Sequence, residues 1–213
     1  PVSRAELPTL ALIIPTLDGK ELLRDCLRSL QDVDYPHQKL TLCVVDNGSS
    51  DGTAEWLSSG YPAIKVVRLE GNRGFAEACN LGVERTATQE IVAFVNNDMR
   101  FDRQFLIELV TPIARGVCDA TTARRMSWDG RTLDGAGVGS TFVGIAVQPG
   151  FGEPLGPEHE IRRRTLFPCG GAMAMSRAAF EDLGGFDADF FAYYEDLDLG
   201  WRAWVAGYDV HYV

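Results

Sequence analysis

The stretch that most constrains the fold of this chain is residues 90–102, where an apolar run meets a polar cluster. Five consecutive apolar residues, 91–95, are followed at once by Asn96, Asn97 and Asp98. An apolar run of this length, bounded by polar residues, is typical of a central strand in a parallel sheet that is covered on both faces. In open α/β sheets, chemistry takes place just beyond the carboxyl ends of such strands. The polar cluster is therefore expected to lie at a site.

Two roles are open for this polar cluster. A carboxylate flanked by amide oxygens can hold a hard divalent cation and, through that cation, a diphosphate. An Asn-Asn-Asp sequence can equally form a turn that caps the next helix. These residues alone favour neither role, so the rest of the chain has to decide between them.

Strands and helices alternate along the first half of the chain. Apolar strands are expected at 10–14, 40–45, 64–69 and 91–95, and a helical pattern follows each of them. Four strands that alternate with helices through short connections form the βαβ pattern of a parallel sheet. We therefore expect an α/β fold with a mostly parallel central sheet flanked by helices.

The pattern changes after about residue 117. Residues 121–147 contain short apolar pieces interrupted by Gly-containing turns, which indicates hairpins rather than crossovers. A surface loop is expected at 148–160, and a helix at 177–183. The second half is thus less regular than the first, and we expect it to complete the same site.

Composition excludes several classes of protein. With a net charge of −10, the chain has no overall electrostatic attraction for nucleic acid or for an anionic membrane. No apolar run approaches the roughly 18 residues that a membrane span needs. The five cysteines are scattered and form no CxxC pair, which argues for a reducing compartment and against a zinc site. We expect a cytoplasmic domain without a membrane span, excerpted from a longer chain.

Three polar clusters follow strand ends in the first half. Pro15 and Thr16 follow the first strand, Asp46 opens a turn rich in Gly and Ser after the second, and Asp98 closes the third cluster. Because the carboxyl ends of parallel strands lie at one edge of a sheet, these clusters should converge on one crevice. Asp46 can accept hydrogen bonds from a base or ribose there, or it can simply shape its turn.

Arg73 lies between Gly71 and Gly74 at the start of an expected helix. It can contact a phosphate by its charge, together with the free backbone N–H groups of that helix start, or it can be an exposed, solvated Arg. The chain has no GxGxxG after a strand and no GxxxxGK[ST]. This absence argues against a dinucleotide-dependent dehydrogenase and against a P-loop protein.

A dense run of acids and aromatic residues lies near the end of the chain. Glu195, Asp196 and Asp198 are three carboxylates within four residues. Acids at a helix start are favoured by the helix dipole, which is a purely structural explanation. Crowded like charges beside aromatic rings also raise the pKa of one carboxyl, as a general base requires. Trp201 and Trp204, further along, are expected to pack in the core.

These residues together resemble the family 2 glycosyltransferases with the GT-A fold, in particular their rhamnosyltransferase-like bacterial branch. The resemblance covers nearly the whole chain, in order. It rests on Ile14-Pro15-Thr16, residues 44–53, Gly71-Asn72-Arg73-Gly74-Phe75-Ala76 with Asn80, Asn96-Asn97-Asp98, Gly170-Gly171-Ala172, Gly184-Gly185-Phe186-Asp187 and Glu195-Asp196-Leu197-Asp198-Leu199.

The resemblance implies an inverting transfer of a sugar from a nucleotide-sugar donor to an acceptor hydroxyl, in polysaccharide or glycan biosynthesis. The donor would be a UDP- or dTDP-sugar, and the acceptor a glycan or a lipid-linked glycan. One catalytic domain would span 1–213, with a nucleotide-binding half at 1–116 and an acceptor half at 117–213. Residues implied in holding the donor are Pro15, Thr16, Asp46, Arg73, Asn97, Gly170 and Gly171.

The resemblance also implies a metal and a base. Asp98 would be the last acid of the DXD motif and bind Mg²⁺ or Mn²⁺ bridging the diphosphate. Asp196 would deprotonate the acceptor hydroxyl, and Glu195 would assist it or bind the acceptor. The motif reads Asn-Asn-Asp here, so its first acid is missing, and His211 comes too early for the metal-binding His that often follows in the family. Two alternatives stay open: a non-catalytic domain that binds nucleotide sugars, and a nucleotidyltransferase.

Overall fold

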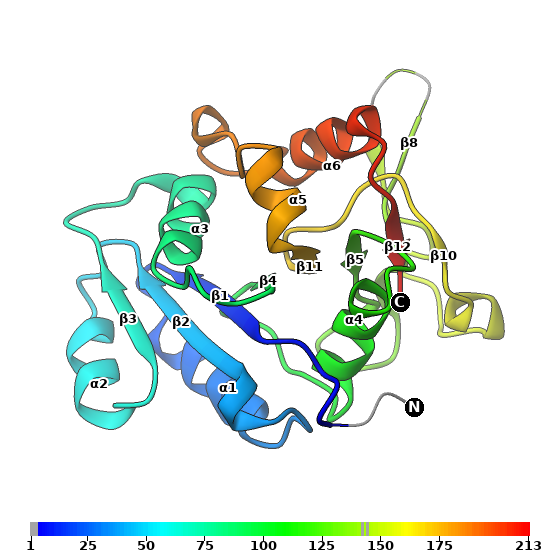
Figure 1. Ribbon diagram of the computed structural model, residues 1–213. Coiled ribbons are helices and arrows are strands. Elements are labelled where there is room, and N and C mark those ends of the chain that lie inside the picture. Colours follow the sequence, from blue (N-terminus) through cyan, green and yellow to red (C-terminus); the bar gives the residue numbers. More distant parts are fainter. Residues whose placement is uncertain (1–3, 142, 144) are drawn as a thin grey trace.

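A single large sheet forms the centre of the molecule (Figure 1). The structure is a computed structural model that describes residues 4–141, 143 and 145–213. Within these residues the sheet has eight strands in the order β10-β12-β5-β11-β4-β1-β2-β3. Their bounds are β1 Leu10–Thr16, β2 Leu40–Asp46, β3 Lys65–Arg68, β4 Ile91–Val95, β5 Ala120–Thr122, β10 Arg163–Arg164, β11 Ala172–Ser176 and β12 Val210–Tyr212.

The sheet is mostly parallel, as the strand and helix alternation predicts. β1 pairs in parallel with both β2 and β4, and β2 pairs in parallel with β3. β11 is antiparallel to its two neighbours, β4 and β5, whereas β5 and β12 are again parallel. The carboxyl ends of β1, β2, β4 and β5 therefore lie at the same edge of the sheet.

Helices cover both faces of the sheet. The α-helices are α1 Lys20–Gln31, α2 Thr53–Gly60, α3 Gly74–Glu84, α4 Phe105–Ala114, α5 Arg177–Asp182 and α6 Glu195–Ala206; the 3₁₀ turns are η1 His37–Lys39, η2 Pro157–Glu160 and η3 Ala188–Phe190. Figure 1 shows α3, α5 and α6 on one side of the sheet and α1 and α4 on the other. Two apolar cores separate in the same way, because alternate residues of each strand point to opposite faces. Every helix of the described residues is too short or too polar to cross a membrane.

The second half forms hairpins, with one exception to the expectation. β6 Arg125–Met126 pairs with β7 Leu133–Gly135, and β8 Gly139–Ser140 pairs with β9 Ala146–Val147, both antiparallel. β5, however, is a strand of the main sheet between β11 and β12, so the expectation of hairpins is wrong for it. Its two threonines make it look polar, yet all three residues are buried. Thr121 can be buried because its hydroxyl donates to Leu109 O at 2.7 Å.

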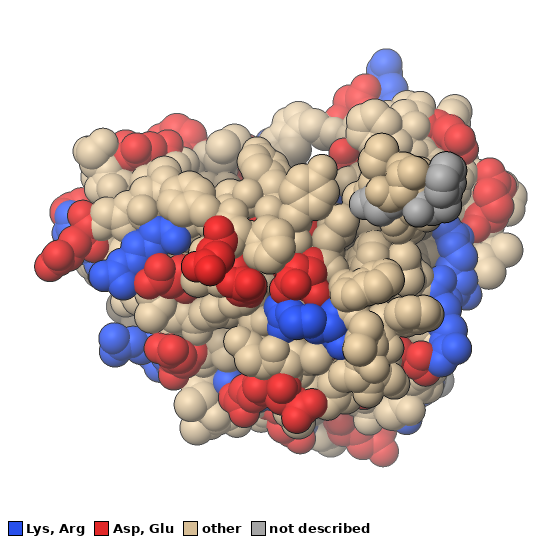
Figure 2. Space-filling model, turned by 90° about the horizontal axis from the view of Figure 1, so that it is seen from above, with Lys and Arg blue, Asp and Glu red and all other residues tan. Residues whose placement is uncertain are grey.

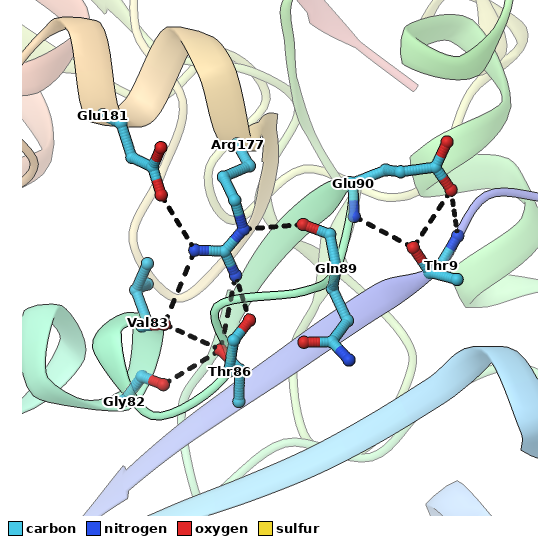
Figure 3. Close-up of polar contacts among 8 residues, drawn as sticks. All are labelled: Thr9, Gly82, Val83, Thr86, Gln89, Glu90, Arg177 and Glu181. Atoms are coloured by element: carbon cyan, nitrogen blue, oxygen red, sulfur yellow. Dashed lines mark hydrogen bonds and ion pairs between the residues drawn. The ribbon is translucent and has the colours of Figure 1, made fainter.

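Arg177 fixes the edge of the sheet opposite the polar clusters (Figure 3). This first residue of α5 is largely buried, and its Nε donates to Gln89 O at 2.6 Å. Its two Nη atoms reach Val83 O at 3.5 Å and Thr86 O, near the end of α3. A cation is favoured at a helix carboxyl end, where carbonyl groups lack partners within the helix. Arg177 thereby joins α3, α5 and the segment that leads into β4.

Replacement of Arg177 by Ala is expected to destabilise the protein by about 2–4 kcal/mol, because the part-buried carbonyl groups of Val83, Thr86 and Gln89 lose a charged donor. Urea unfolding measures the change. Arg164→Ala is the matched control, since Arg164 is exposed and pairs with Asp209 at the surface, and should change the stability far less than Arg177→Ala. Equal losses in the two variants would contradict the role given to Arg177.

Candidate active site

The loops after β1 and β2 are tied to each other by their polar residues. Asp18 Oδ1 accepts a hydrogen bond from Ser50 N at 2.7 Å, and Asp18 N donates to Ser49 Oγ at 2.9 Å. Asp51 accepts from Lys20 N at 3.1 Å. Asp18 has a positive φ of 47°, which Asp tolerates better than most residues. The two loops therefore form one rigid rim at the carboxyl edge of the sheet.

Thr16 and Asp46 lie inside this rim. Both are buried, and they face each other in register across β1 and β2. Asp46 Oδ1 accepts from Ser49 N at 3.0 Å, which fulfils the turn-shaping role. Its other oxygen, Oδ2, is buried and has no partner among the described residues. Leaving a buried carboxylate oxygen without a hydrogen-bond donor costs stability. Asp46 therefore has an acceptor that a ligand could use, at the point where the sequence predicts a base or ribose.

Asn47 connects β2 to the turn before α3. Its Oδ1 accepts from Arg73 N at 2.9 Å, and its Nδ2 donates to Asn72 Oδ1 at 3.0 Å and to Gly74 O at 3.1 Å. No role for Asn47 is predicted from the sequence. The only sequence signal for it is its position directly after Asp46, where a buried strand ends.

The amino end of α3 differs from the expectation for Arg73. Phe191 O accepts from Phe75 N at 2.6 Å and from Ala76 N at 3.3 Å, and Asn72 Oδ1 accepts from Gly74 N at 2.9 Å. The N–H groups expected to be free for a phosphate are therefore already bonded. Phe191 is far away in sequence, so this cap could not be foreseen from the helix start.

Gly74 is required at this contact for two reasons. Its φ is +84°, which favours glycine, and a Cβ there would collide with the carbonyl oxygen of Phe191. The Arg73 side chain remains exposed and pairs with Glu77 at 2.9 Å. Only its guanidinium, and not the helix start, is available to a phosphate.

Asn97 and Asp98 lie at the end of β4, and the structure gives them different partners. Asn97 Nδ2 donates to Thr16 Oγ1 at 2.8 Å, which ties the end of β4 to the end of β1. Asp98 is exposed. No hydrogen bond or ion pair of its carboxylate is found within the described part of the chain. Asp98 does not cap α4: the N-cap residue is Gln104, and in the turn before the helix Asp102 Oδ1 accepts from Gln104 N at 2.8 Å. Of the two roles open for the cluster, the helix cap is thus not realised by Asp98.

The described residues contain no group of three or more His, Cys, Asp or Glu side chains able to hold a metal ion. A single carboxylate still fits Mg²⁺ or Mn²⁺ when a substrate supplies further oxygens, because such ions are commonly bound by one or two carboxylates plus substrate phosphates and water. The exposed carboxylate of Asp98 at a strand end meets that requirement. It does not amount to a site that would hold a metal tightly without a diphosphate.

Asp196 is held at the same edge through β11. Its Oδ2 accepts from Gly170 N at 2.8 Å, and its Oδ1 accepts from Leu197 N at 2.8 Å. One residue further, Gly171 O accepts from Asn96 N at 3.1 Å. A short path of hydrogen bonds and peptide bonds therefore connects Asp196 to the Asn96–Asp98 cluster. The Gly170 N–H, implied by the resemblance to lie near a donor sugar, is used to orient this carboxylate.

Glu195 lies beside Asp196 in a different environment. Its side chain is buried, with 6% exposed, and its Oε2 has no partner among the described residues. Burial raises the pKa of Glu195 to about 7, and the charge of the adjacent Asp196 adds to the rise. Asp198, the third acid, pairs with Arg202 at 2.6 Å. The three acids predicted together thus have three environments.

The loop that leads into α6 is strained. Phe191, Tyr193 and Tyr194 all have positive φ, at 58°, 70° and 71°. Each such residue costs about 1–3 kcal/mol, and strain of this kind tends to gather at functional sites. Trp201 and Trp204, expected in the core, are instead 53% and 58% exposed, with ring centroids 5.8 Å apart. That expectation is wrong because their face of α6 points away from the sheet.

A separate hollow of about 510 Å³ lies beside the loop that follows Asp98. Met99, Phe101 and Trp128 contribute to its lining, and the Arg100 guanidinium lies 4.3 Å from the Trp128 ring centroid. None of the donor or catalytic residues implied by the resemblance lines it. The candidate site is therefore the open sheet edge and not this hollow.

Comparison with known proteins assigns the family. Residues 11–184 match the model of Glycosyl transferase family 2, and the chain belongs to this family. The fold agrees: a mannosyltransferase from Pyrobaculum calidifontis, PcManGT, solved with GDP-Man and Mn²⁺, superposes with a TM-score of 0.72 at 24% identity, covering 96% of this chain and 54% of that one. The predicted GT-A class of fold is confirmed.

Two relatives are similar in sequence. The O-antigen biosynthesis protein RfbC of Myxococcus xanthus is 31% identical over 204 residues, which cover 92% of this chain and 16% of RfbC. The N-acetylglucosaminyl-diphospho-decaprenol L-rhamnosyltransferase of Mycobacterium tuberculosis is 26% identical over 200 residues, which cover 82% of this chain and 64% of that protein. The chain thus spans less than two thirds of either relative.

The raised pKa of Glu195 makes stability depend on pH in a defined direction. The folded state holds the proton more tightly than the unfolded state, whose carboxyl has the ordinary pKa of 4.5. The stabilisation by this proton is complete below pH 4.5 and is lost as the pH rises from 4.5 through 7. Glu195→Gln should therefore gain stability relative to the unchanged protein, by about 3 kcal/mol between pH 4 and 8.

Urea unfolding at pH 4, 6 and 8 measures this difference. Glu84→Gln, which removes an exposed carboxylate of α3, serves as the control for the loss of a surface charge. If the free energy of unfolding of Glu195→Gln changed with pH in the same way as that of the unchanged protein, the Glu195 carboxyl would not be buried as described.

Proposed function

We propose that this chain is the catalytic domain of an inverting glycosyltransferase that moves a sugar from a nucleotide-sugar donor to an acceptor hydroxyl. Family membership supports the reaction class. RfbC and the rhamnosyltransferase support a role in the biosynthesis of a polysaccharide or lipid-linked glycan. We assign 1–116 to the nucleotide-binding half and 117–213 to the acceptor half.

The observation that carries this proposal is the short link between the two acidic regions. Asn96 N donates to Gly171 O, and Gly170 N donates to Asp196 Oδ2. The carboxylate proposed as base and the carboxylate proposed for the diphosphate are thus set on one frame of adjacent strands, β4 and β11. A transferase that activates a hydroxyl and stabilises a leaving diphosphate needs both groups at one edge.

The nucleotide is proposed to lie over the ends of β1 and β2. Asp46, with its unused Oδ2, would accept a hydrogen bond from the base or ribose, and Pro15 and Thr16 would form the floor. The Arg73 guanidinium would meet the diphosphate, since charged donors make the strongest contacts to phosphate. Asn97 would keep Thr16 in place through its hydrogen bond.

Asp98 would hold Mg²⁺ or Mn²⁺, and that ion would neutralise charge on the departing nucleoside diphosphate. PcManGT was solved with Mn²⁺ and GDP-Man, which supports a divalent ion for this chain. The missing first acid of the motif fits an ion that binds together with the donor. The nucleotide proposed here is UDP or dTDP, and the acceptor is a glycan or lipid-linked glycan.

Asp196 would take the proton from the acceptor hydroxyl as the new glycosidic bond forms at the anomeric carbon. Both of its oxygens accept one backbone N–H, which fixes the carboxylate and leaves each oxygen a second lone pair. Glu195, buried behind it with a raised pKa, would keep the second carboxyl largely uncharged below pH 7 and so spare Asp196 a like charge. Gly170 and Gly171 would shape the floor below the donor sugar.

Replacement of Asp196 by Asn should lower the rate of sugar transfer about 10²–10⁴-fold, which is the usual contribution of a general base. Donor binding should be unchanged, because the amide is isosteric and the acid lies on the acceptor side. Transfer is measured as release of nucleoside diphosphate in the presence of acceptor. Unchanged turnover, or loss of donor binding in parallel, would exclude Asp196 as the base and favour a binding domain without catalysis.

Replacement of Asp98 by Ala should remove the dependence of nucleotide affinity on the metal. Calorimetry of UDP and dTDP with and without Mn²⁺ should show tighter binding with the ion in the unchanged protein and equal binding in the variant. Asp102→Ala, four residues on, is the matched control and should retain the metal effect, because Asp102 is used by the turn before α4. Metal-independent binding in the unchanged protein would refute the role of Asp98.

A further inference from the structure

The last residue of η3 and the loop that connects it to α6 expose a group of aromatic side chains directly before the two acids. Exposed fractions are 38% for Phe190, 51% for Phe191, 82% for Tyr193 and 59% for Tyr194. Neither tyrosine hydroxyl makes a hydrogen bond within the described residues, and neither tyrosine ring pairs with another there. Several large aromatic rings exposed together form an apolar patch, and such patches, unlike single exposed rings, mark binding sites.

The backbone of this loop is fixed although its rings are free. At one end, Phe191 O is bound by the N–H groups of Phe75 and Ala76. At the other end, Asp198 N donates to Tyr194 O at 2.9 Å, which starts α6. The two tyrosines are therefore presented on a rigid support. A binding group that is already rigid before the ligand arrives loses less conformational entropy on binding.

We propose that Tyr193 and Tyr194 form an aromatic platform on which a pyranose ring of the acceptor stacks, which places its hydroxyl at Asp196. This inference rests on the proposed function, since it names the acceptor surface of the same site. One face of a pyranose ring carries mainly C–H groups and is apolar, whereas its rim carries hydroxyls. The aromatic rings would contact the apolar face of the sugar, and the carboxylate of Asp196 would accept a hydrogen bond from a hydroxyl on its rim.

The acids around the platform favour a sugar over a bilayer. Asp187 and Asp189 precede the tyrosines and Asp196 follows them, so an inserted aromatic side chain would bring carboxylates toward the hydrocarbon, which is costly. In the view from above, uncharged side chains cover much of the face that carries α6, and acidic groups lie among and around them (Figure 2). Sugar hydroxyls donate hydrogen bonds to such carboxylates.

Saturation-transfer NMR with simple glycosides tests the platform. The probes are methyl β-D-glucopyranoside, methyl N-acetyl-β-D-glucosaminide and methyl α-L-rhamnopyranoside, with mannitol as a polyol that has no ring face. At least one glycoside should bind, and mannitol should not. Tyr194→Ala and Tyr193→Ala should each lower the affinity for that glycoside about tenfold. Tyr194→Phe and Tyr193→Phe should bind it as tightly as the unchanged protein does.

Phe151→Ala is the matched control, because Phe151 is 70% exposed in the loop at 148–156, away from the acids in sequence, and should have no effect. Glycoside binding that is equal in the Tyr→Ala variants, or absent throughout, overturns the proposal. Tyrosine-dependent binding to neutral phosphatidylcholine vesicles in place of glycosides also overturns it, in favour of a membrane contact.

Calorimetry of UDP and dTDP with Mn²⁺ on the same variants separates this inference from the proposed function. Nucleotide binding that persists in Tyr194→Ala while glycoside binding falls supports the platform. Nucleotide binding without any glycoside binding refutes the platform alone. Failure of every nucleotide to bind refutes the donor site. Tyrosine-dependent glycoside binding in that case would still support the platform.

Discussion

The pairing of β4 with both β1 and β11 is the constraint on which the candidate site depends. β4 is buried along its whole length and has a parallel neighbour on one side and an antiparallel neighbour on the other. The parallel neighbour brings Thr16 and, through β2, Asp46 to the edge where β4 ends. Because β11 runs the opposite way, it begins at that edge, so Gly170 and Gly171 lie there before it. If β11 were parallel to β4, its carboxyl end would lie at this edge, and Gly170 and Gly171, which precede β11, would lie at the opposite edge.

A second connection runs across the site through the backbone of Phe191. Its carbonyl caps α3, which belongs to the half proposed to bind the nucleotide, while its chain continues into the acids of α6. Capping a helix start satisfies N–H groups that would otherwise be without partners. The same contact requires glycine at position 74, and the loop that supplies the carbonyl has positive φ at Phe191, Tyr193 and Tyr194. The position of the acids thus depends on α3 as well as on the sheet.

Much of this arrangement could be predicted from the sequence, and the limits have physical causes. The four strands 10–14, 40–45, 64–69 and 91–95 and the helices between them are local patterns, and all are found close to their expected bounds. β5 was missed because its burial depends on a hydrogen bond from Thr121 to Leu109. In the cap on α3 and in the bond from Gly170 to Asp196, a backbone N–H group finds its acceptor far along the chain, and such long-range contacts leave no periodic signal.

The environments of the two adjacent acids follow from such long-range contacts and not from their identities. Adjacent residues of a helix point in different directions, so Glu195 and Asp196 meet different neighbours although they follow each other in sequence. In the structure Asp196 has two backbone N–H donors, whereas an oxygen of Glu195 is buried without any. Burial disfavours the charged form and raises the pKa of Glu195 to about 7. In the proposed function, this difference in surroundings would leave the role of base to Asp196 alone.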